Sequence, residues 1–269
     1  MADGIVPVLP LRINFLNYAH DFINRITLKE PFTLIDLGCG PYAIIAQLAK
    51  QLFGWKAVCI EHSERSRTAA ERNVRKNGDD ASITFSNESD TTLLPTFKSP
   101  AIGEKRAAPP HYVVMCNPPW FVGDDTENYE KETKGGEVQF VSRLLEEYKC
   151  SGNIKCIAFC ILVGRKCNVK VILKMAKSYG ASTMFHTMRQ GTKTRYFIGW
   201  TFDTVTDSET EGKTKSKVKS EKVTIVKEKH LSGSFATLKH AIDPWMKSNR
   251  IDYKIILSRK WIYSDVLFP

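Results

Sequence analysis

The chain has 269 residues, 42% of them hydrophobic, and carries 39 Lys and Arg against 29 Asp and Glu, a formal net charge of +10. This composition is typical of a globular protein with one large domain, and it excludes the disordered, collagen-like and mucin-like classes. The apolar runs are strand-sized and no charged leader precedes an early hydrophobic block, so we expect an intracellular protein that does not bind membranes.

Strand and helix patterns alternate along residues 31–202. The expected strands are Phe32–Leu37, Lys56–Ile60, Ile83–Phe85, Tyr112–Cys116, Lys155–Val163 and a closing pair, Thr183–Met188 and Tyr196–Phe202. The expected helices are Ala43–Phe53, Glu64–Lys76, Glu137–Tyr148 and Val169–Tyr179. This order predicts an α/β, Rossmann-like domain, with a mostly parallel sheet and helices on both of its faces.

The remaining segments differ from this domain in composition. Residues 203–222 contain almost no apolar side chains and are expected to form a flexible linker. Beyond them the apolar pattern returns, with expected strands at Val223–Val226 and Tyr253–Leu257 and a helix at Ser234–Met246. We therefore expect an N-terminal segment 1–30, a main domain 31–202, a linker 203–222 and a small C-terminal α/β piece 223–269.

Cysteine and histidine usage argues against cross-links and metals. The seven cysteines are an odd number, lie mostly in apolar strand-like runs and form no C-x-x-C pair. They are interpreted as reduced core thiols without a disulfide partner. The histidines lie far apart without ligand spacing, so no metal site is predicted.

The positive charge is concentrated in one stretch. Between Tyr148 and Phe202 there are ten Lys and Arg and no Asp or Glu, whereas the rest of the chain is balanced at 29 against 29. Such a stretch is typical of a protein that binds a polyanion. A solvated basic face is the alternative.

A glycine turn follows the first expected strand of the main domain. The segment Asp36-Leu37-Gly38-Cys39-Gly40 places two glycines where the backbone must bend tightly and approach a ligand closely. Glu61, at the end of the second strand, can accept hydrogen bonds from both ribose hydroxyls. A dinucleotide-binding fingerprint or a purely structural turn also fits these residues. Asp36 favours a cationic or amine-bearing ligand, as in the S-adenosylmethionine loop that the D-x-G-x-G form resembles.

A second motif, Asn117-Pro118-Pro119-Trp120, follows the strand Tyr112–Cys116 and is expected at the same sheet edge. The Asn117 side-chain oxygen and the Pro118 carbonyl can accept the two N–H groups of an amine, and Trp120 offers a flat stacking face. Two such acceptors favour the pyramidal form of the amine, and their hydrogen bonds strengthen as its nitrogen becomes positive during transfer of a methyl group to it. No general base is therefore needed before the transfer. A turn with a packed aromatic is the structural alternative.

The expected target is an unpaired base. Holding a base out of its stack costs a few kcal/mol, and stacking on Trp120 is worth about 1–3 kcal/mol, so the two terms are similar. A bulged or unpaired base is therefore favoured over one in a full duplex.

Together these motifs resemble the amino-methyltransferases that modify adenine N6 or glutamine N5. The segments that narrow the resemblance are Val6–Ile23, Gly135–Leu145, Val163–Val169 and Arg189–Phe202. They are similar to the RNA adenine-N6 methyltransferase family called methyltransferase-like protein sixteen, whose bacterial relatives modify ribosomal RNA and whose eukaryotic members modify U6 small nuclear RNA. The resemblance extends from Val6 to about Phe202 and is weaker from Val223 onward. It implies a class I S-adenosylmethionine-dependent methyltransferase fold.

The resemblance also implies site residues. The expected cofactor contacts are Arg12, Asp36, Gly38, Gly40, Tyr42, Glu61, Thr92 and Asn117. The expected catalytic group is Asn117, Pro118, Pro119 and Trp120. The resemblance implies Arg195 as an RNA contact, and the basic stretch adds Arg165, Lys166, Arg189 and Lys193 as further expected RNA contacts.

The resulting hypothesis is that the chain forms N6-methyladenosine in structured RNA, with U6 small nuclear RNA as the implied partner and S-adenosylhomocysteine as the cofactor product. We expect a monomer that acts in the nucleus. A non-catalytic RNA-binding module on the same fold and an NAD-dependent oxidoreductase are the alternatives. A protein glutamine target is disfavoured, because a neutral protein substrate would not need the basic stretch.

Overall fold

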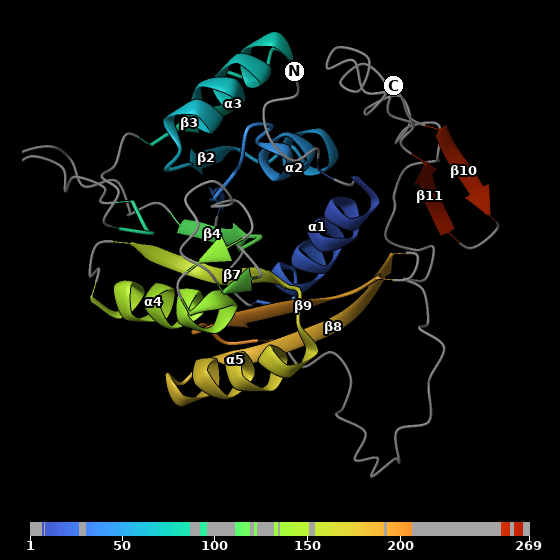
Figure 1. Ribbon diagram of the computed structural model, residues 1–269. Coiled ribbons are helices and arrows are strands. Elements are labelled where there is room, and N and C mark those ends of the chain that lie inside the picture. Colours follow the sequence, from blue (N-terminus) through green and yellow to red (C-terminus); the bar gives the residue numbers. More distant parts are fainter. Residues whose placement is uncertain are drawn as a thin grey trace, which may run out of the picture.

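One seven-stranded sheet organises the protein, in the order β3-β2-β1-β4-β7-β9-β8 (Figure 1). The computed structural model describes residues 7, 9–26, 31–86, 92–95, 111–118, 121–122, 132–133, 135–150, 154–190, 193–205, 254–258 and 261–265. The sheet strands are β1 (Phe32–Leu37), β2 (Ala57–Ile60), β3 (Ile83–Phe85), β4 (His111–Cys116), β7 (Lys155–Val163), β8 (Ser182–Gln190) and β9 (Lys193–Thr201). The helices are α1 (Leu9–Ile23), α2 (Ile44–Phe53), α3 (Glu64–Lys76), α4 (Gly136–Cys150) and α5 (Lys166–Ser178).

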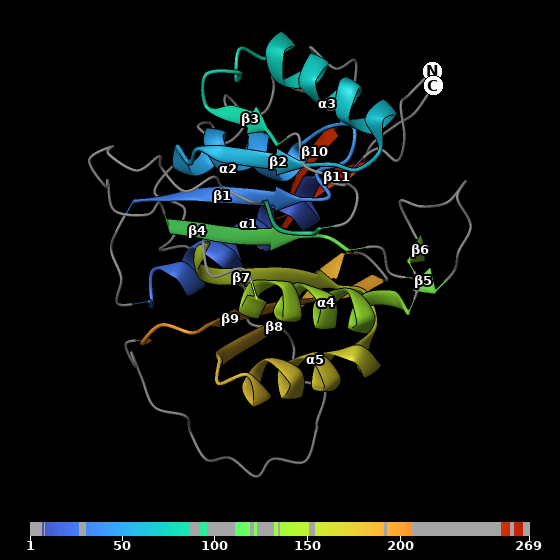
Figure 2. The ribbon, with the colours of Figure 1, turned by 90° about the vertical axis from the view of Figure 1, so that its left-hand side faces the viewer.

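The strands that run parallel end at a common edge. β1 pairs in parallel with both β2 and β4, and β4 pairs in parallel with β7. Figure 2 shows the arrows of β1, β2, β4 and β7 pointing the same way. β9 is antiparallel to β7 and to β8, so the β8–β9 turn lies at the edge where β7 ends. The carboxyl edge of the sheet therefore gathers the segments that follow β1, β2, β4 and β7.

Two hydrophobic clusters cover the two faces of the sheet. Leu34 of β1 belongs to a cluster with α1, α2 and part of α3, whereas its neighbour Ile35 belongs to a cluster with α4 and α5. This division follows from the alternation of side chains along a strand. Helix α1 was expected only as part of an N-terminal segment, and it packs into the first cluster with Phe15 and Leu16 fully buried.

The predicted α/β architecture with a mostly parallel sheet is confirmed. The largest differences in the main domain are at α5, which begins at Lys166 rather than Val169, and at the closing pair, whose strands each extend to nine residues. None of the helices within the described residues is long and apolar enough to cross a membrane.

The C-terminal region is described in part. The expected strand near residue 253 is present as β10 (Lys254–Ser258), which pairs antiparallel with β11 (Trp261–Asp265), a strand that was not expected. The expected strand at 223–226 and helix at 234–246 lie outside the described residues. Two short strands, β5 (Phe121–Val122) and β6 (Glu132–Thr133), form a separate pair.

Candidate active site

The register of β1 and β4 brings the two predicted motifs side by side. Leu37 pairs with Cys116, so the residues that follow, Gly38 and Asn117, leave the sheet at the same level. The Oδ1 atom of Asn117 is buried and has no hydrogen-bond partner among the described residues. An unpaired buried acceptor is costly, which makes this oxygen a candidate for binding a ligand donor. Pro118 is buried beside it, and Pro119 and Trp120 lie outside the described residues.

The glycine turn leaves open space where a ligand can approach. Gly38 and Gly40 adopt φ angles of 71° and 64°, in the left-handed region that favours glycine. The backbone N–H groups of Gly38 and Cys39 both donate to the carbonyl of Ile60, at 2.9 and 3.1 Å. A Cβ placed on either glycine would meet no heavy atom within 4 Å. The turn is therefore fixed by β2 while its outer side stays open.

Glu61 completes this turn from the end of β2. Its carboxylate accepts a hydrogen bond from the Gly40 backbone N–H at 2.8 Å and another from the Ser63 backbone N–H at 3.0 Å. A carboxylate has about four acceptor positions, so Glu61 keeps capacity for further donors such as ribose hydroxyls.

Asp36 links β1 to helix α2 under the turn. It is fully buried, and its Oδ2 accepts from the Ala46 backbone N–H at 3.0 Å. Its Oδ1 is buried without a hydrogen-bond partner in the described part of the chain. Burial raises the pKa of Asp36 to about 7; the Ala46 bond opposes this rise, Glu61 adds to it and Arg12 opposes it.

Arg12 reaches this cluster from helix α1. Burial lowers its pKa to about 10, the charge of Asp36 raises it, and the charge of Arg195 lowers it further. Arg195 shares a face of β9 with Phe197, which belongs to the cluster beneath α1. Residues from α1, β1 and β9 therefore interact electrostatically on one face of the sheet.

The two other expected cofactor residues, Tyr42 and Thr92, lie in segments with contacts of their own. Tyr42 packs against the hydrophobic cluster of α1 and α2, and its carbonyl accepts from Gln47 Nε2 at 2.6 Å. Thr92 is half-buried, and the backbone N–H groups of Leu93 and Leu94, which follow it, donate to the Glu147 carboxylate of α4 at 2.6 and 3.2 Å. The segment that carries Thr92 is thus held by α4 rather than by the glycine turn.

The predicted RNA contacts all lie at or beyond the carboxyl edge. Arg165 and Lys166 are exposed in the turn that follows β7. Arg189, Lys193 and Arg195 lie at the β8–β9 turn, where Arg189 pairs with Thr194. The other basic residues of the stretch are elsewhere: Lys149 and Lys155 near the opposite edge, and Lys170, Lys174 and Lys177 on α5.

Sequence reasoning missed Glu137, which is fully buried in the first turn of α4. Its carboxylate accepts from the Gly164 backbone N–H at 2.5 Å and from Asn168 Nδ2 at 2.7 Å. Burial raises the pKa of Glu137, against the opposing effects of Asn168, Gly164 and Arg165. The only signal in the sequence is an acidic residue directly after two glycines at a helix start.

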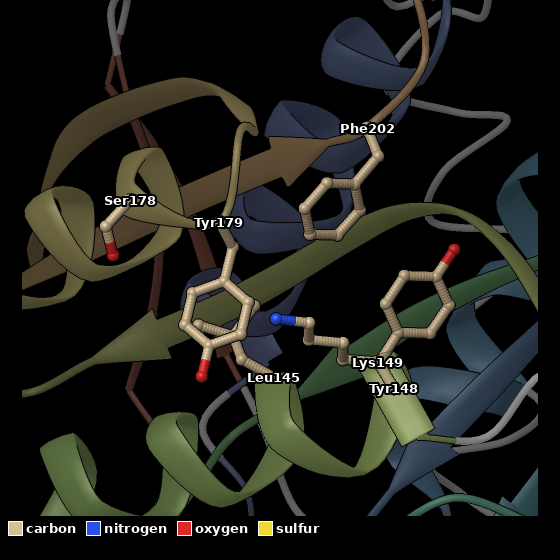
Figure 3. A pocket seen from close by; sticks show the side chains of 6 residues that line it. All are labelled: Leu145, Tyr148, Lys149, Ser178, Tyr179 and Phe202. Carbon is tan, nitrogen blue, oxygen red and sulfur yellow. The ribbon is translucent and has the colours of Figure 1, made fainter.

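A cavity of about 340 Å³ lies away from this site. Its lining residues are Leu145, Tyr148, Lys149, Ser178, Tyr179 and Phe202 (Figure 3). The Tyr148 hydroxyl donates to the carbonyl of Cys156 near the start of β7, which places the cavity toward the amino edge of the sheet. The Lys149 ammonium lies 5.5 Å from the centre of the Tyr179 ring, between the aromatic side chains. The cavity therefore does not join the glycine turn.

A family model described as RNA methyltransferase matches residues 2–133 and 122–204. A U6 small nuclear RNA (adenine-(43)-N(6))-methyltransferase of Drosophila melanogaster is 28% identical over 222 residues, covering 74% of this chain and 71% of the relative. The chain spans about half the length of similarly named Caenorhabditis relatives.

Solved structures share the fold. The hMettl16 catalytic domain, in complex with a MAT2A 3'UTR hairpin, has a TM-score of 0.62 at 22% identity and covers 78% of this chain and 76% of its own. The N-terminal domain of human METTL16, in complex with SAH, has a TM-score of 0.57 at 24% identity and covers 74% and 72%. Both support a Rossmann-like methyltransferase fold.

Proposed function

The chain belongs to the RNA methyltransferase family, and we propose that it methylates the N6 amine of an unpaired adenine in structured RNA, with S-adenosylmethionine as the methyl donor. The buried Asn117 Oδ1 carries this proposal, because it lacks a partner among the described residues and lies level with the open glycine turn. An acceptor placed there fits an amine N–H, which donates more strongly as its nitrogen becomes positive.

The residues present fit the cofactor. The orphaned oxygens of Asn117 and Asp36 and the open outer side of Gly38 and Gly40 suit a ligand that carries amine and cationic groups. Glu61 would hold the ribose hydroxyls, and Arg12 and Asp36 would set the charge around the turn. When bound, S-adenosylmethionine supplies a methyl group activated by a sulfonium.

The protein's own residues position the acceptor amine. Asn117 Oδ1 and the Pro118 carbonyl hold its N–H groups, and the rigid prolines keep competing donors out of the turn. The adenine is expected to stack on Trp120, and this part of the proposal rests on the sequence alone. Pro118 is buried, so the acceptor region is shielded from bulk water, which strengthens its hydrogen bonds.

The basic residues at the carboxyl edge would bind the RNA backbone. Arg165 and Lys166 follow β7, which is the neighbour of the Asn117 strand, and the β8–β9 turn adds Arg189, Lys193 and Arg195. Positive side chains beside the Asn117 site suit the phosphate backbone of RNA. The target adenine would leave its stack to enter this site. The U6 small nuclear RNA methyltransferase activity of the fruit fly relative supports U6 small nuclear RNA as the substrate and the nucleus as the place of action.

The experiment is methyl transfer to a panel of short hairpin RNAs, one carrying the U6 target region, with labelled S-adenosylmethionine and identification of the modified nucleoside. The expected product is N6-methyladenosine in an unpaired position. Any other modified nucleoside contradicts the substrate assignment.

Two binding measurements separate the alternatives. RNA binding without any cofactor-induced rise in melting temperature favours a non-catalytic RNA-binding module. A rise with NAD but not with S-adenosylmethionine favours an oxidoreductase. A rise in melting temperature with S-adenosylmethionine, together with transfer of labelled methyl to RNA, supports the proposal.

A further inference from the structure

Glu137 is a buried acidic residue that the proposed reaction does not use. It has no exposed surface, and it lies in the first turn of α4, directly after Gly135 and Gly136, whose φ angles are 74° and 65°. A Cβ on Gly135 would come within 2.5 Å of the Gln139 side chain, so only glycine fits there. The helix start is therefore built to bring Glu137 inward.

Glu137 binds a turn that is distant in sequence. Its two oxygens accept from the Gly164 backbone N–H and from the Asn168 side chain, at 2.5 and 2.7 Å. The Asn168 backbone N–H in turn donates to the Arg165 carbonyl at 3.1 Å, which closes the turn. One carboxylate thus fixes both ends of residues 164–168.

This turn carries exposed cations next to the candidate active site. Arg165 and Lys166 are exposed, whereas Gly164 and Asn168 on either side of them are partly buried. Cys116 pairs with Ile161 in the β4–β7 register, so the turn leaves β7 close to the level at which Asn117 and Pro118 leave β4. The backbone that carries Arg165 and Lys166 is therefore held at the edge where the RNA is proposed to bind.

We propose that Glu137 is a positioning residue for RNA: through Gly164 and Asn168 it holds the Arg165–Lys166 turn in the orientation that contacts the substrate backbone. This inference rests on the proposed function. Glu137 itself touches neither the cofactor nor the reacting amine. Loss of its bonds releases the turn, and the backbone that carries the two cations is then no longer held beside the strand that leads to Asn117.

The test compares Asn168→Ala with the wild type in methyl transfer to one hairpin RNA. Asn168→Ala removes the side-chain bond to Glu137 and leaves the carboxylate bound to Gly164, so the chain should fold. We expect KM for RNA to rise by about tenfold, with kcat and the affinity for S-adenosylmethionine unchanged. The logarithm of the RNA association constant falls linearly with the logarithm of the salt concentration, and this line should become less steep by about 1 to 2, because up to two phosphate contacts are lost. Ser142→Ala is the matched control, since it breaks an exposed side-chain bond on α4 to Glu146.

A double-mutant cycle separates positioning from general destabilisation. In an Arg165→Gln, Lys166→Gln background, Asn168→Ala should not weaken RNA binding further, because the positioned cations are already absent. Glu137→Gln should bind RNA better than Glu137→Ala: one amide oxygen can still accept from Gly164, and the Asn168 amide can turn to accept from the new NH2 group.

The outcomes are distinct. Unchanged RNA affinity and salt dependence in Asn168→Ala overturn the positioning role. The same holds if Asn168→Ala weakens RNA binding as much in the Arg165→Gln, Lys166→Gln background as in the wild type. Neither result affects the proposed function as long as the wild type methylates the hairpin. A wild-type chain that binds no hairpin RNA at low salt overturns the proposed function itself.

Discussion

Gly38 and Gly54 share a φ angle of 71°, and at both positions a Cβ would meet no heavy atom within 4 Å. They lie on either side of helix α2: Gly38 in the turn between β1 and α2, beside Asn117, and Gly54 at the C-terminal cap of α2. The pair therefore has the same backbone requirement and differs only in its distance from the candidate site.

Gly38→Ala and Gly54→Ala form a matched pair of variants. Each should lower the free energy of unfolding by about 1–2 kcal/mol, because alanine is strained in the left-handed region. Only Gly38→Ala should also weaken S-adenosylmethionine binding, by tenfold or more, because its methyl group enters the open side of the turn. Urea unfolding and calorimetric titration measure the two effects, and equal cofactor affinity in both variants contradicts the site.

Asn117→Ala should reduce the rate of methyl transfer by about 10²–10³-fold, as expected for the loss of one preorganised hydrogen-bond partner. RNA affinity should change little, because the acceptor acts mainly as charge develops on the amine. Single-turnover transfer of labelled methyl to a hairpin measures the rate. Ser178→Ala, which removes an exposed 2.8 Å bond to the Met175 carbonyl at the end of α5, is the control; a similar rate loss there points to destabilisation.

Glu147→Ala tests the clamp on the segment that carries Thr92. The variant leaves the Leu93 and Leu94 backbone N–H groups without their acceptor, so we expect a loss of about 1–3 kcal/mol in the free energy of unfolding. If Thr92 lies beside the cofactor adenine, cofactor affinity falls as well. The neighbouring Glu146→Ala, at an exposed position, should change neither quantity in the same assays. Full cofactor affinity in Glu147→Ala argues against the role of Thr92.

The raised pKa of Asp36 predicts a dependence of stability on pH. Between the ordinary value of 3.8 and about 7, the folded chain keeps a proton that the unfolded chain has released, so stability falls as the pH rises through this window. From pH 5 to pH 8 the loss is about 2–3 kcal/mol. Asp36→Asn keeps an oxygen for the Ala46 N–H and should remove this component. Denaturant midpoints at both pH values measure it, and an identical pH dependence in the two proteins refutes the assignment to Asp36.

Local patterns predicted the elements that carry the site. The strands Ile83–Phe85 and Lys155–Val163 and the helix Glu64–Lys76 match β3, β7 and α3. The first is a short apolar segment, the second a continuous apolar run and the third a charged surface helix, and each is followed by a glycine or a polar residue. Helix α5 begins earlier than expected because its first turn, from Lys166, is polar and gives no apolar period.

Helix α1 shows a limit of this reasoning. Its second half has the usual helical spacing, with Phe15, Leu16, Ala19, Phe22 and Ile23 buried, but its first half buries Leu9, Leu11 and Ile13, so more than one side of the helix is covered. A pattern that depends on such surroundings cannot be recognised from the helix alone.

The sequence by itself determined which chemical groups follow each strand: the glycines after β1, Glu61 after β2, Asn117 after β4 and the cations after β7. The choice of residues at a strand end is local, and it can be seen without neighbours. Only the tertiary structure decided that Leu37 lies beside Cys116, that Arg12 reaches Asp36, and that Glu137 binds Gly164, which is 27 residues away. These relations depend on strand register and on the burial of polar groups, which arise when distant segments pack together and must satisfy one another's hydrogen bonds.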